Sequence, residues 1–175
     1  MKHPYETLAY VARLSFRDAH GLEAVFDWYQ RIRVLTPGMR FVLQEIWGSG
    51  DQLKDYVSTS ADPIHHARLN NRDIVVSKLK QPAKVGDEIE LYSTRRIHHA
   101  FKDGNRFFWE YSPISPTRRA RVAIDFPLGR EPHQLQVAAS SGSRTPQVAR
   151  PGTMQLITTV DHPTLRSLYR IDWRG

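Results

Sequence analysis

Two stretches decide the fold of this chain, residues 8–16 (LAYVARLSF) and residues 120–126 (ARVAIDF). In each stretch an apolar residue occupies every second position, and most of the residues between are polar, charged or small. A period of two places the apolar side chains on one face of a strand and the others on the opposite face. Both stretches are therefore predicted to be strands with one buried face, and the chain is predicted to be all-β.

The same alternation returns along most of the chain, interrupted by short clusters of Gly, Pro, Asn and Asp that suit turns. Regular spacing of this kind predicts an antiparallel β-sandwich or related β-barrel of about ten to eleven strands with little helix. We expect one domain over residues 1–175. The predicted strands are residues 7–17, 23–35, 39–47, 73–80, 87–101, 105–112, 118–126, 133–140, 153–160 and 167–173. Apolar positions in the clearest runs predict a core that includes Leu14, Val122, Ile124, Phe126 and Trp173.

Three segments fit this pattern less well. Residues 22–33 match both a helical face and a strand face, and we favour the strand because the Thr-Pro-Gly turn that follows suits a hairpin with 39–47. Residues 51–72 show no clear period, which predicts a long connection with a helical turn. Residues 140–146 are small and polar, as in a mobile loop.

The composition is that of an ordinary globular protein, with 175 residues, 40% hydrophobic and 25% charged. The chain has no cysteine, which removes disulfides and thiolate chemistry. We expect a cytoplasmic protein without a membrane partner, because no run approaches the roughly 20 apolar residues of a membrane span and the N-terminus lacks a signal-peptide pattern. The formal charge of +7 favours an acidic partner.

Two histidine pairs, at 65–66 and 98–99, raise the question of a metal site. Adjacent side chains on a strand point to opposite faces, so a site would have to combine one histidine from each pair, with His162 or His133 and a carboxylate. No spaced ligand motif, nucleophile elbow or phosphate-binding loop accompanies them. We therefore expect no metal, no cofactor and no catalytic residues. Residues 84–91 also resemble a strand opening of hotdog-fold hydratases, which keeps a hotdog-like or histidine-dependent enzyme as an alternative.

An aromatic run at residues 107–111 lies between clusters of basic residues. Phe107, Trp109 and Tyr111 share one strand face, which favours core packing over base stacking. The basic residues around it predict a ligand or partner surface on a sheet face. This candidate surface consists of Arg95, Arg96, His98, Lys102, Arg118, Arg119 and Arg121.

Several short motifs occur in a recognisable order, at residues 31–38, 46–50, 79–86, 121–127 and 169–173. This order resembles the β-rich domain that follows the helix-turn-helix in a group of actinobacterial transcription regulators. The resemblance covers nearly the whole chain and implies a sensing or interaction module. This chain has no helix-turn-helix pattern of its own, so the resemblance does not imply DNA reading by a recognition helix.

The function expected from the sequence is a non-enzymatic interaction or ligand-sensing module of a bacterial signalling, regulatory or defence system. A protein or a small anionic ligand is the favoured partner. The alternative is a nucleic-acid-associated protein that uses the basic sheet face.

Overall fold

The computed structural model describes residues 3–17, 23–47, 55–69, 72–98, 107–126, 134–139, 147–149 and 155–174. Within these residues the regular secondary structure consists of strands, which confirms the all-β prediction. No helix among the described residues is long and apolar enough to cross a membrane.

The largest sheet has seven strands in the order β11-β12-β9-β1-β2-β7-β4. Its members are β11 (Gln147–Ala149), β12 (Gln155–Asp161), β9 (Arg119–Asp125), β1 (Tyr5–Phe16), β2 (Glu23–Val34), β7 (Glu88–His98) and β4 (Val57–Ser58). β9 runs antiparallel to β12 but parallel to β1. The sheet is therefore mixed, with one parallel pairing among strands that otherwise pair antiparallel in the part of the chain that the structure describes.

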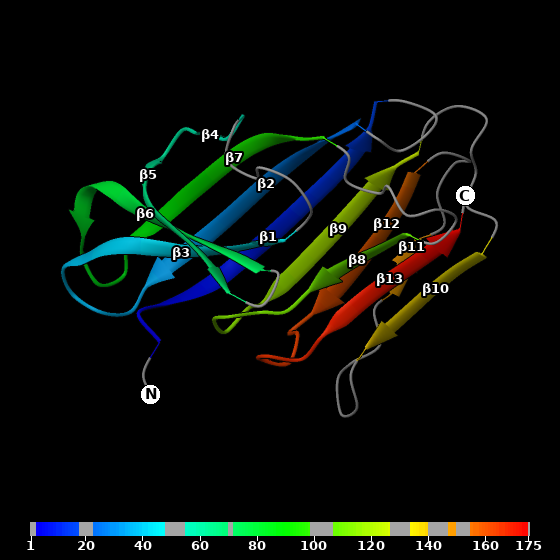
Figure 1. Cartoon of the computed structure of the whole chain (residues 1–175). Coiled ribbons are helices and arrows are strands. Elements are labelled where there is room, and N and C mark those ends of the chain that lie inside the picture. The colour runs from blue at the N-terminus through cyan, green and yellow to red at the C-terminus, as the bar shows by residue number, and fades with distance from the viewer. Residues whose placement is uncertain are drawn as a thin grey trace.

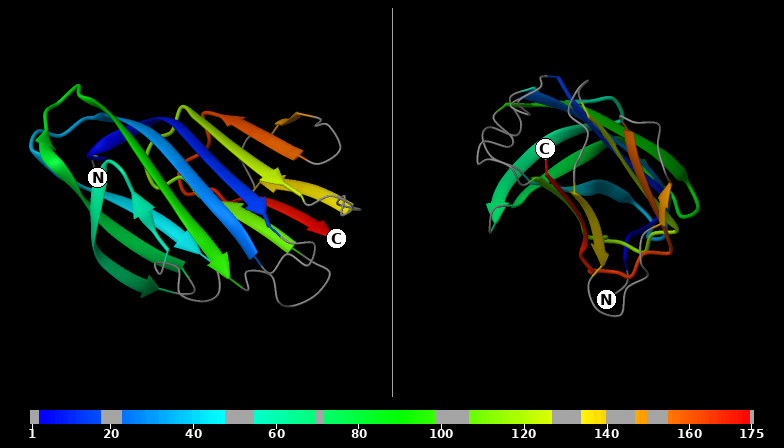
Figure 2. Two further views of the ribbon diagram at one scale, coloured as in Figure 1. Left: turned by 90° about the horizontal axis from the view of Figure 1, so that it is seen from above. Right: turned by 90° about the vertical axis from the view of Figure 1, so that its right-hand side faces the viewer.

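Two three-stranded sheets complete the fold. One has the order β10 (Gln134–Ala139), β13 (Tyr169–Arg174), β8 (Phe107–Tyr111), and the other β3 (Met39–Trp47), β6 (Arg72–Ala83), β5 (Ala61–Leu69). Figure 1 shows the β3–β6–β5 sheet in front of β1, β2 and β7, and the β10–β13–β8 sheet in front of β9 and β12. The turned views in Figure 2 show curved layers that face one another, with the large sheet forming one layer and the two small sheets the other.

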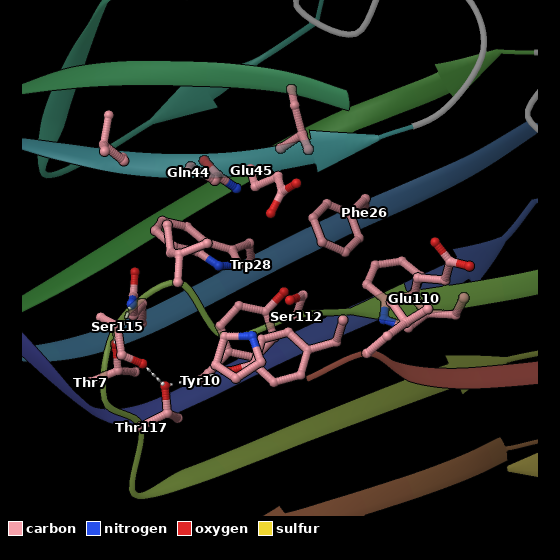
Figure 3. A pocket seen from close by; sticks show the side chains of 18 of the residues that line it. Thr7, Tyr10, Phe26, Trp28, Gln44, Glu45, Glu110, Ser112, Ser115 and Thr117 are labelled. Carbon is pink, nitrogen blue, oxygen red and sulfur yellow. Dashed lines mark hydrogen bonds between the residues drawn. The ribbon is translucent and has the colours of Figure 1, made fainter. Parts of the chain in front are cut away.

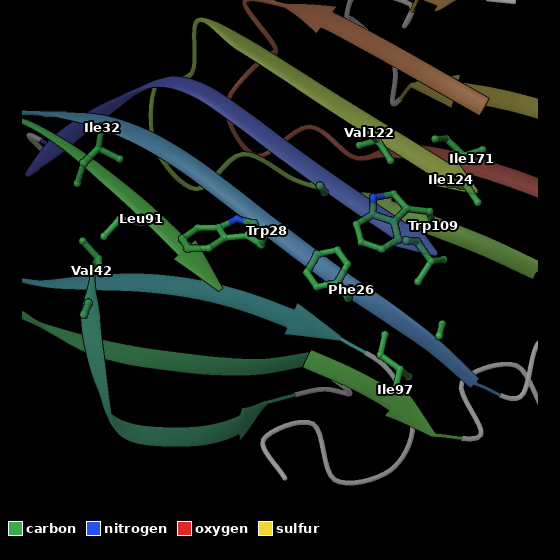
Figure 4. Packing of buried hydrophobic residues seen from close by; sticks show 14 of the residues in the cluster. Phe26, Trp28, Ile32, Val42, Leu91, Ile97, Trp109, Val122, Ile124 and Ile171 are labelled. Carbon is green, nitrogen blue, oxygen red and sulfur yellow. The ribbon is translucent and has the colours of Figure 1, made fainter. Parts of the chain in front are cut away.

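The core fills the space between these layers. Its main cluster draws side chains from all three sheets, among them Ile32, Val42, Trp109 and Ile171 (Figure 4). The predicted core residues Leu14, Val122, Ile124, Phe126 and Trp173 are all buried, as are Trp109 and Tyr111 of the aromatic run. Burial of one face of each strand is what imposes the period of two in the sequence.

The structure decides two uncertain segments. Glu23–Val34 is strand β2, with buried side chains at alternate positions, so the strand interpretation of 22–33 is confirmed. That result removes the helix on which the hotdog alternative depended. The prediction of a helical connection over 51–72 is wrong, because β4 and β5 lie there. β5 is an end strand whose described side chains after Ala61 are exposed, so burial imposes no period on its sequence. The segment 140–146 lies outside the described residues.

Candidate functional site

The predicted basic surface is divided between two faces of the large sheet. Arg95 and Arg96 are neighbours on β7 and therefore point to opposite sides. Arg96 is exposed, whereas Arg95 is only 4% exposed and lies over the ring of Phe26, 4.9 Å from its centroid. Burial lowers the pKa of Arg95 to about 10. The assignment of Arg95 to the partner surface is therefore wrong, since its side chain faces the interior.

The other described members lie on or beside the opposite, solvent-facing side, which we call the outer face of the large sheet. Arg118 contacts Glu6 at 3.0 Å, and Arg119 contacts Asp161 at 2.6 Å. Arg121 is exposed on the same face as Arg119. His98 lies at the end of β7, 3.2 Å from Asp55 and 3.9 Å from Glu23. Lys102 lies outside the described residues.

Ion pairs extend across the outer face of the large sheet. Arg13 of β1 lies 2.5 Å from Asp125 of β9, and Ser15 and Gln155 also donate hydrogen bonds to this carboxylate. Partial burial raises the pKa of Asp125, but the hydrogen bonds from Arg13, Gln155 and Ser15 outweigh it and leave that pKa below its ordinary value. Arg31 and Arg33 both contact Glu88. Carboxylates therefore lie against most of the cations on this face.

The solvent-facing side of the β3–β6–β5 sheet is different. Residues paired across strands lie on the same face, and the pairing places three rows of three residues there. These nine residues, the outer face of the β3–β6–β5 sheet, are Phe41, Leu43, Glu45, Lys78, Val76, Ile74, Asp62, His65 and Ala67. Phe41 and Leu43 are 47% and 46% exposed, although Val42 between them is buried.

Sequence reasoning missed this face. Its signal was the continuous run Phe41-Val42-Leu43, in which both faces of the strand carry apolar side chains. An interior face and a contact face on the same strand produce such a run, and so does a strand buried on both sides.

A cavity of about 60 Å³ lies where the two small sheets meet above the large one (Figure 3). Tyr10 of β1 and Phe26 and Trp28 of β2 line it from the large sheet. Residues 43–46 of β3 and 109–111 of β8 form its sides, with the loop 112–117.

Hydrogen bonds hold the loop end of this cavity together. Gln30 donates to the Thr7 hydroxyl at 2.6 Å, and the Thr7 and Ser115 hydroxyls lie 2.8 Å apart. All three side chains are buried, which fixes the loop against β1 and β2.

Charged groups also line the cavity. Arg95 is the most buried of them, and the partly exposed Glu45 and Glu110 lie nearer the surface. Glu110 accepts a hydrogen bond from Arg170 at 2.9 Å. Burial, with the nearby Tyr111 as a smaller cause, raises the pKa of Tyr10 above its ordinary value, so this phenol stays protonated at neutral pH. The site therefore combines aromatic side chains with positively and negatively charged ones.

The histidines are spread over the molecule. His66 lies 2.5 Å from the buried Asp73, and His98 lies far along β7 beside Asp55. Among the described residues, no three side chains of His, Asp or Glu come together in a way that could hold a metal ion. His99 and His133 lie outside that part of the chain.

No protein-family model and no curated protein matches this chain. Its fold is similar to part of several solved structures. One is a candidate protease from Parabacteroides distasonis, with a TM-score of 0.60 and 9% identity over 98% of this chain and 40% of that chain. Another is a variant of an M1 zinc metallopeptidase from Deinococcus radiodurans bound to a Tyr-Ser-Ala substrate, with a TM-score of 0.51 and 12% identity over 97% of this chain and 42% of that chain.

This chain thus spans about two-fifths of the length of the solved proteins it matches. At these identities the likeness is one of fold. The resemblance to the actinobacterial regulators stays a prediction.

Proposed function

We propose that this chain is a non-enzymatic interaction module that binds a folded protein through the outer face of the β3–β6–β5 sheet. The observation that carries the proposal is the pair Phe41 and Leu43, large apolar side chains nearly half exposed on the same face of one strand. Ile74 and Val76 lie beside them on β6 and extend the apolar surface. Contiguous exposed apolar surface of this kind marks interaction sites in soluble proteins.

Charged side chains of both signs surround the apolar centre, with Asp62 and Glu45 on the face itself. Lys78 pairs with Phe41 across the strands, and Lys80 follows on the same side of β6, both exposed. An apolar centre with a charged rim is the ordinary anatomy of a protein interface. The net charge of +7 adds long-range attraction to an acidic surface.

The comparisons support a partner that is itself protein. In the solved structures the fold accounts for 40% and 42% of longer chains, so most of each polypeptide lies outside it. A fold that shares a chain with other polypeptide has a use for an apolar contact face. The setting we propose is a bacterial signalling, regulatory or defence system in the cytoplasm.

Nucleic acid has less support as the partner. Arg13, Arg118 and Arg119 on the outer face of the large sheet each lie against a carboxylate, which reduces the charge available to phosphates. This alternative would use Arg96 of β7 and Arg121 of β9, which are both exposed. Sub-micromolar binding of an oligonucleotide at physiological salt, weakened by Arg96→Ala with Arg121→Ala, would favour the nucleic-acid alternative.

The test compares two pairs of exposed apolar residues. The immobilised chain is used to capture proteins from a bacterial lysate, and a captured protein is identified by mass spectrometry, purified and titrated against variants by biolayer interferometry. Phe41→Ser with Leu43→Ser is expected to weaken its affinity about tenfold or more, because apolar anchors dominate interface energies.

The matched control is Leu35→Ser with Val85→Ser, which removes side chains that are 46% and 59% exposed but lie outside the outer face of the β3–β6–β5 sheet. This control is expected to bind like the wild type. Equal weakening by both pairs, or no weakening by either, would reject the proposed face.

A further inference from the structure

The large sheet supplies two aromatic side chains with polar atoms to the cavity. Tyr10 of β1 pairs with Gln30 of β2, and Trp28 lies two residues from Gln30 on the same face. Diagonal neighbours on one face of a sheet are within reach of each other's long side chains. The phenol of Tyr10 and the indole of Trp28 therefore border the same space (Figure 3).

Several other polar side chains of the lining are bonded to one another. Gln30, Thr7 and Ser115 form the hydrogen-bonded group at the loop end. The side-chain oxygen of Gln44 accepts a hydrogen bond from Tyr56 at 2.9 Å. These hydrogen bonds hold the walls of the cavity together.

The Tyr10 hydroxyl differs from these groups. No hydrogen bond joins it to another of the residues that the structure describes, whereas the Tyr111 hydroxyl donates to Thr117 at 3.5 Å. Burial, and then the nearby Tyr111, raise the pKa of Tyr10, so its hydroxyl keeps its proton at neutral pH and can donate it. The indole N–H of Trp28 can also only donate. Enclosed donors of this kind usually have an acceptor, which favours a ligand with an oxygen atom here.

The charge that acts on this hydroxyl comes mainly from Arg95. Arg95 opposes the rise in the pKa of Tyr10, and its effect is larger than the opposite effect of Glu45. With a pKa of about 10, Arg95 is itself protonated at neutral pH. Its charge acts through space, so it attracts an anion whichever of its N–H groups already bond within the protein. Glu110 lies against Arg170, at 2.9 Å, which reduces its repulsion of an anion.

The size and the walls of the cavity limit the ligand. Leu43 and Ile114 line the cavity and are 46% and 41% exposed, so it opens at the surface. Its volume of about 60 Å³ leaves space for a few non-hydrogen atoms. The rings of Phe26 and Trp109 offer apolar contact. A largely apolar wall with a few polar groups is typical of small-molecule sites.

We propose that the cavity binds a small organic carboxylate. One carboxylate oxygen accepts a hydrogen bond from the Tyr10 hydroxyl in the positive field of Arg95, and a short apolar tail lies against Phe26 and Trp109. The inference goes beyond the proposed partner face and does not rest on it, since neither Tyr10 nor Arg95 belongs to that face.

The probes are acetate, propionate and isobutyrate, each compared with its neutral amide of the same shape. They are titrated at pH 7 into the full chain labelled with ¹⁵N. The indole N–H signals of Trp28 and Trp109 are expected to shift and saturate, whereas that of Trp173, which packs against Phe16 and Phe126, is expected to stay. An acid is expected to bind about tenfold more tightly than its amide, because hydrogen bonds to charged groups are stronger. Equal affinity for acid and amide, or no saturable shift with any acid, would overturn the proposal.

Two substitutions in the same wall test the hydrogen bond. Tyr10→Phe removes the hydroxyl and keeps the ring contact with Tyr111, whose centroid lies 4.4 Å away. This variant is expected to bind propionate about tenfold more weakly. The matched control is Tyr111→Phe, which removes a hydroxyl that donates to Thr117, and it is expected to bind like the wild type. Wild-type affinity in Tyr10→Phe, or equal weakening in both variants, would reject the proposed role of Tyr10.

A third variant keeps the test decisive if the tyrosine variants do not fold. Ser112→Phe fills the cavity from the loop and is expected to abolish the shift of the Trp28 signal. Propionate is expected to raise the melting temperature of the wild type, as any ligand of the native state does, but not that of Ser112→Phe. Binding by Ser112→Phe that equals the wild type would place the carboxylate elsewhere. Phe41 and Leu43 are unchanged throughout, so failure here is separate from failure of the proposed partner face.

Discussion

The outer face of the large sheet and the outer face of the β3–β6–β5 sheet are built from the same kind of strand and meet solvent in opposite ways. On the large sheet, cations lie opposite carboxylates on neighbouring strands, as Arg13 does with Asp125 and Arg119 with Asp161. On the small sheet, Phe41 and Leu43 occupy the corresponding outward positions. The charged side chains of the first face are compatible with solvent. The second face exposes apolar side chains, which the binding of a partner would remove from water.

The difference teaches that net charge alone does not point to the partner face that we propose. Of the arginines predicted for the partner surface, Arg118 and Arg119 lie in exposed ion pairs of the large sheet, and such pairs contribute little stability each. The apolar residues of β3 do not stand out in the sequence because most strands of this fold carry apolar side chains on one face. Only the pairing with β6 and β5 separates the buried apolar face from the exposed one.

The largest expected effect comes from placing an aspartate on the buried face of β9, compared with the same residue on its exposed face. Val122 is buried on the interior face, so Val122→Asp is expected to unfold the domain, because an unpaired buried carboxylate costs several kcal/mol against a total stability of about 5–15 kcal/mol. Its neighbour Arg121 lies on the outer face, and Arg121→Asp is expected to change stability by less than about 0.5 kcal/mol. Thermal unfolding followed by circular dichroism measures the melting temperatures of both variants. Similar melting temperatures would show that the two sides of β9 are wrongly assigned.

A smaller effect is expected at the most connected ion pair of the outer face of the large sheet. Asp125→Asn is expected to lower stability by about 1 kcal/mol at pH 7, because the carboxylate accepts hydrogen bonds from Arg13, Ser15 and Gln155. The pKa of Asp125 is lower in the folded state, so its contribution is full above the unfolded pKa and disappears as pH falls through the folded one. Urea titrations of both proteins from pH 7 to pH 3 should therefore show a difference in stability that narrows toward the acid end. A gap that stays constant with pH would contradict the ion-pair account.

The exposed pair at the edge of the same face should matter less. Arg119 and Asp161 have side chains that are 66% and 47% exposed, and solvent and salt screen such pairs. Asp161→Asn is expected to change stability by at most about 0.5 kcal/mol at low salt and by less in 1 M NaCl. An effect as large as that of Asp125→Asn would mean that the exposure of an ion pair does not determine its contribution to stability.

A small change in stability is also expected on the other face. Phe41→Ser with Leu43→Ser should alter the free energy of unfolding by less than about 1 kcal/mol, since both side chains are already half in water. Fluorescence of an apolar dye such as ANS should fall in this variant. A large loss of stability would show that these side chains serve the fold, which would remove the contrast between the two faces.

The sequence predicted the fold wherever burial on one side imposed a period, as at Leu14 and Val122. It could not predict β5, because an end strand in solvent carries no such period. Arg95 and Arg96 were grouped because they are adjacent in sequence, although adjacency on a strand means separation across the sheet. The cavity was beyond prediction, because Tyr10, Trp28 and Trp109 meet only through the order of the strands.

The parallel pairing of β1 with β9 makes the large sheet dependent on a contact between distant parts of the chain. Tyr10 lies opposite Ala120, while β2 reaches β1 through a short connection. During synthesis, β1 and β2 can form a hairpin early, but the second edge of β1 has no strand partner until β9 leaves the ribosome. Contacts of such long sequence separation slow folding. The centre of the sheet therefore stays incomplete until residues 119–125 have been made, and the second edge of β1 is open to mispairing until then.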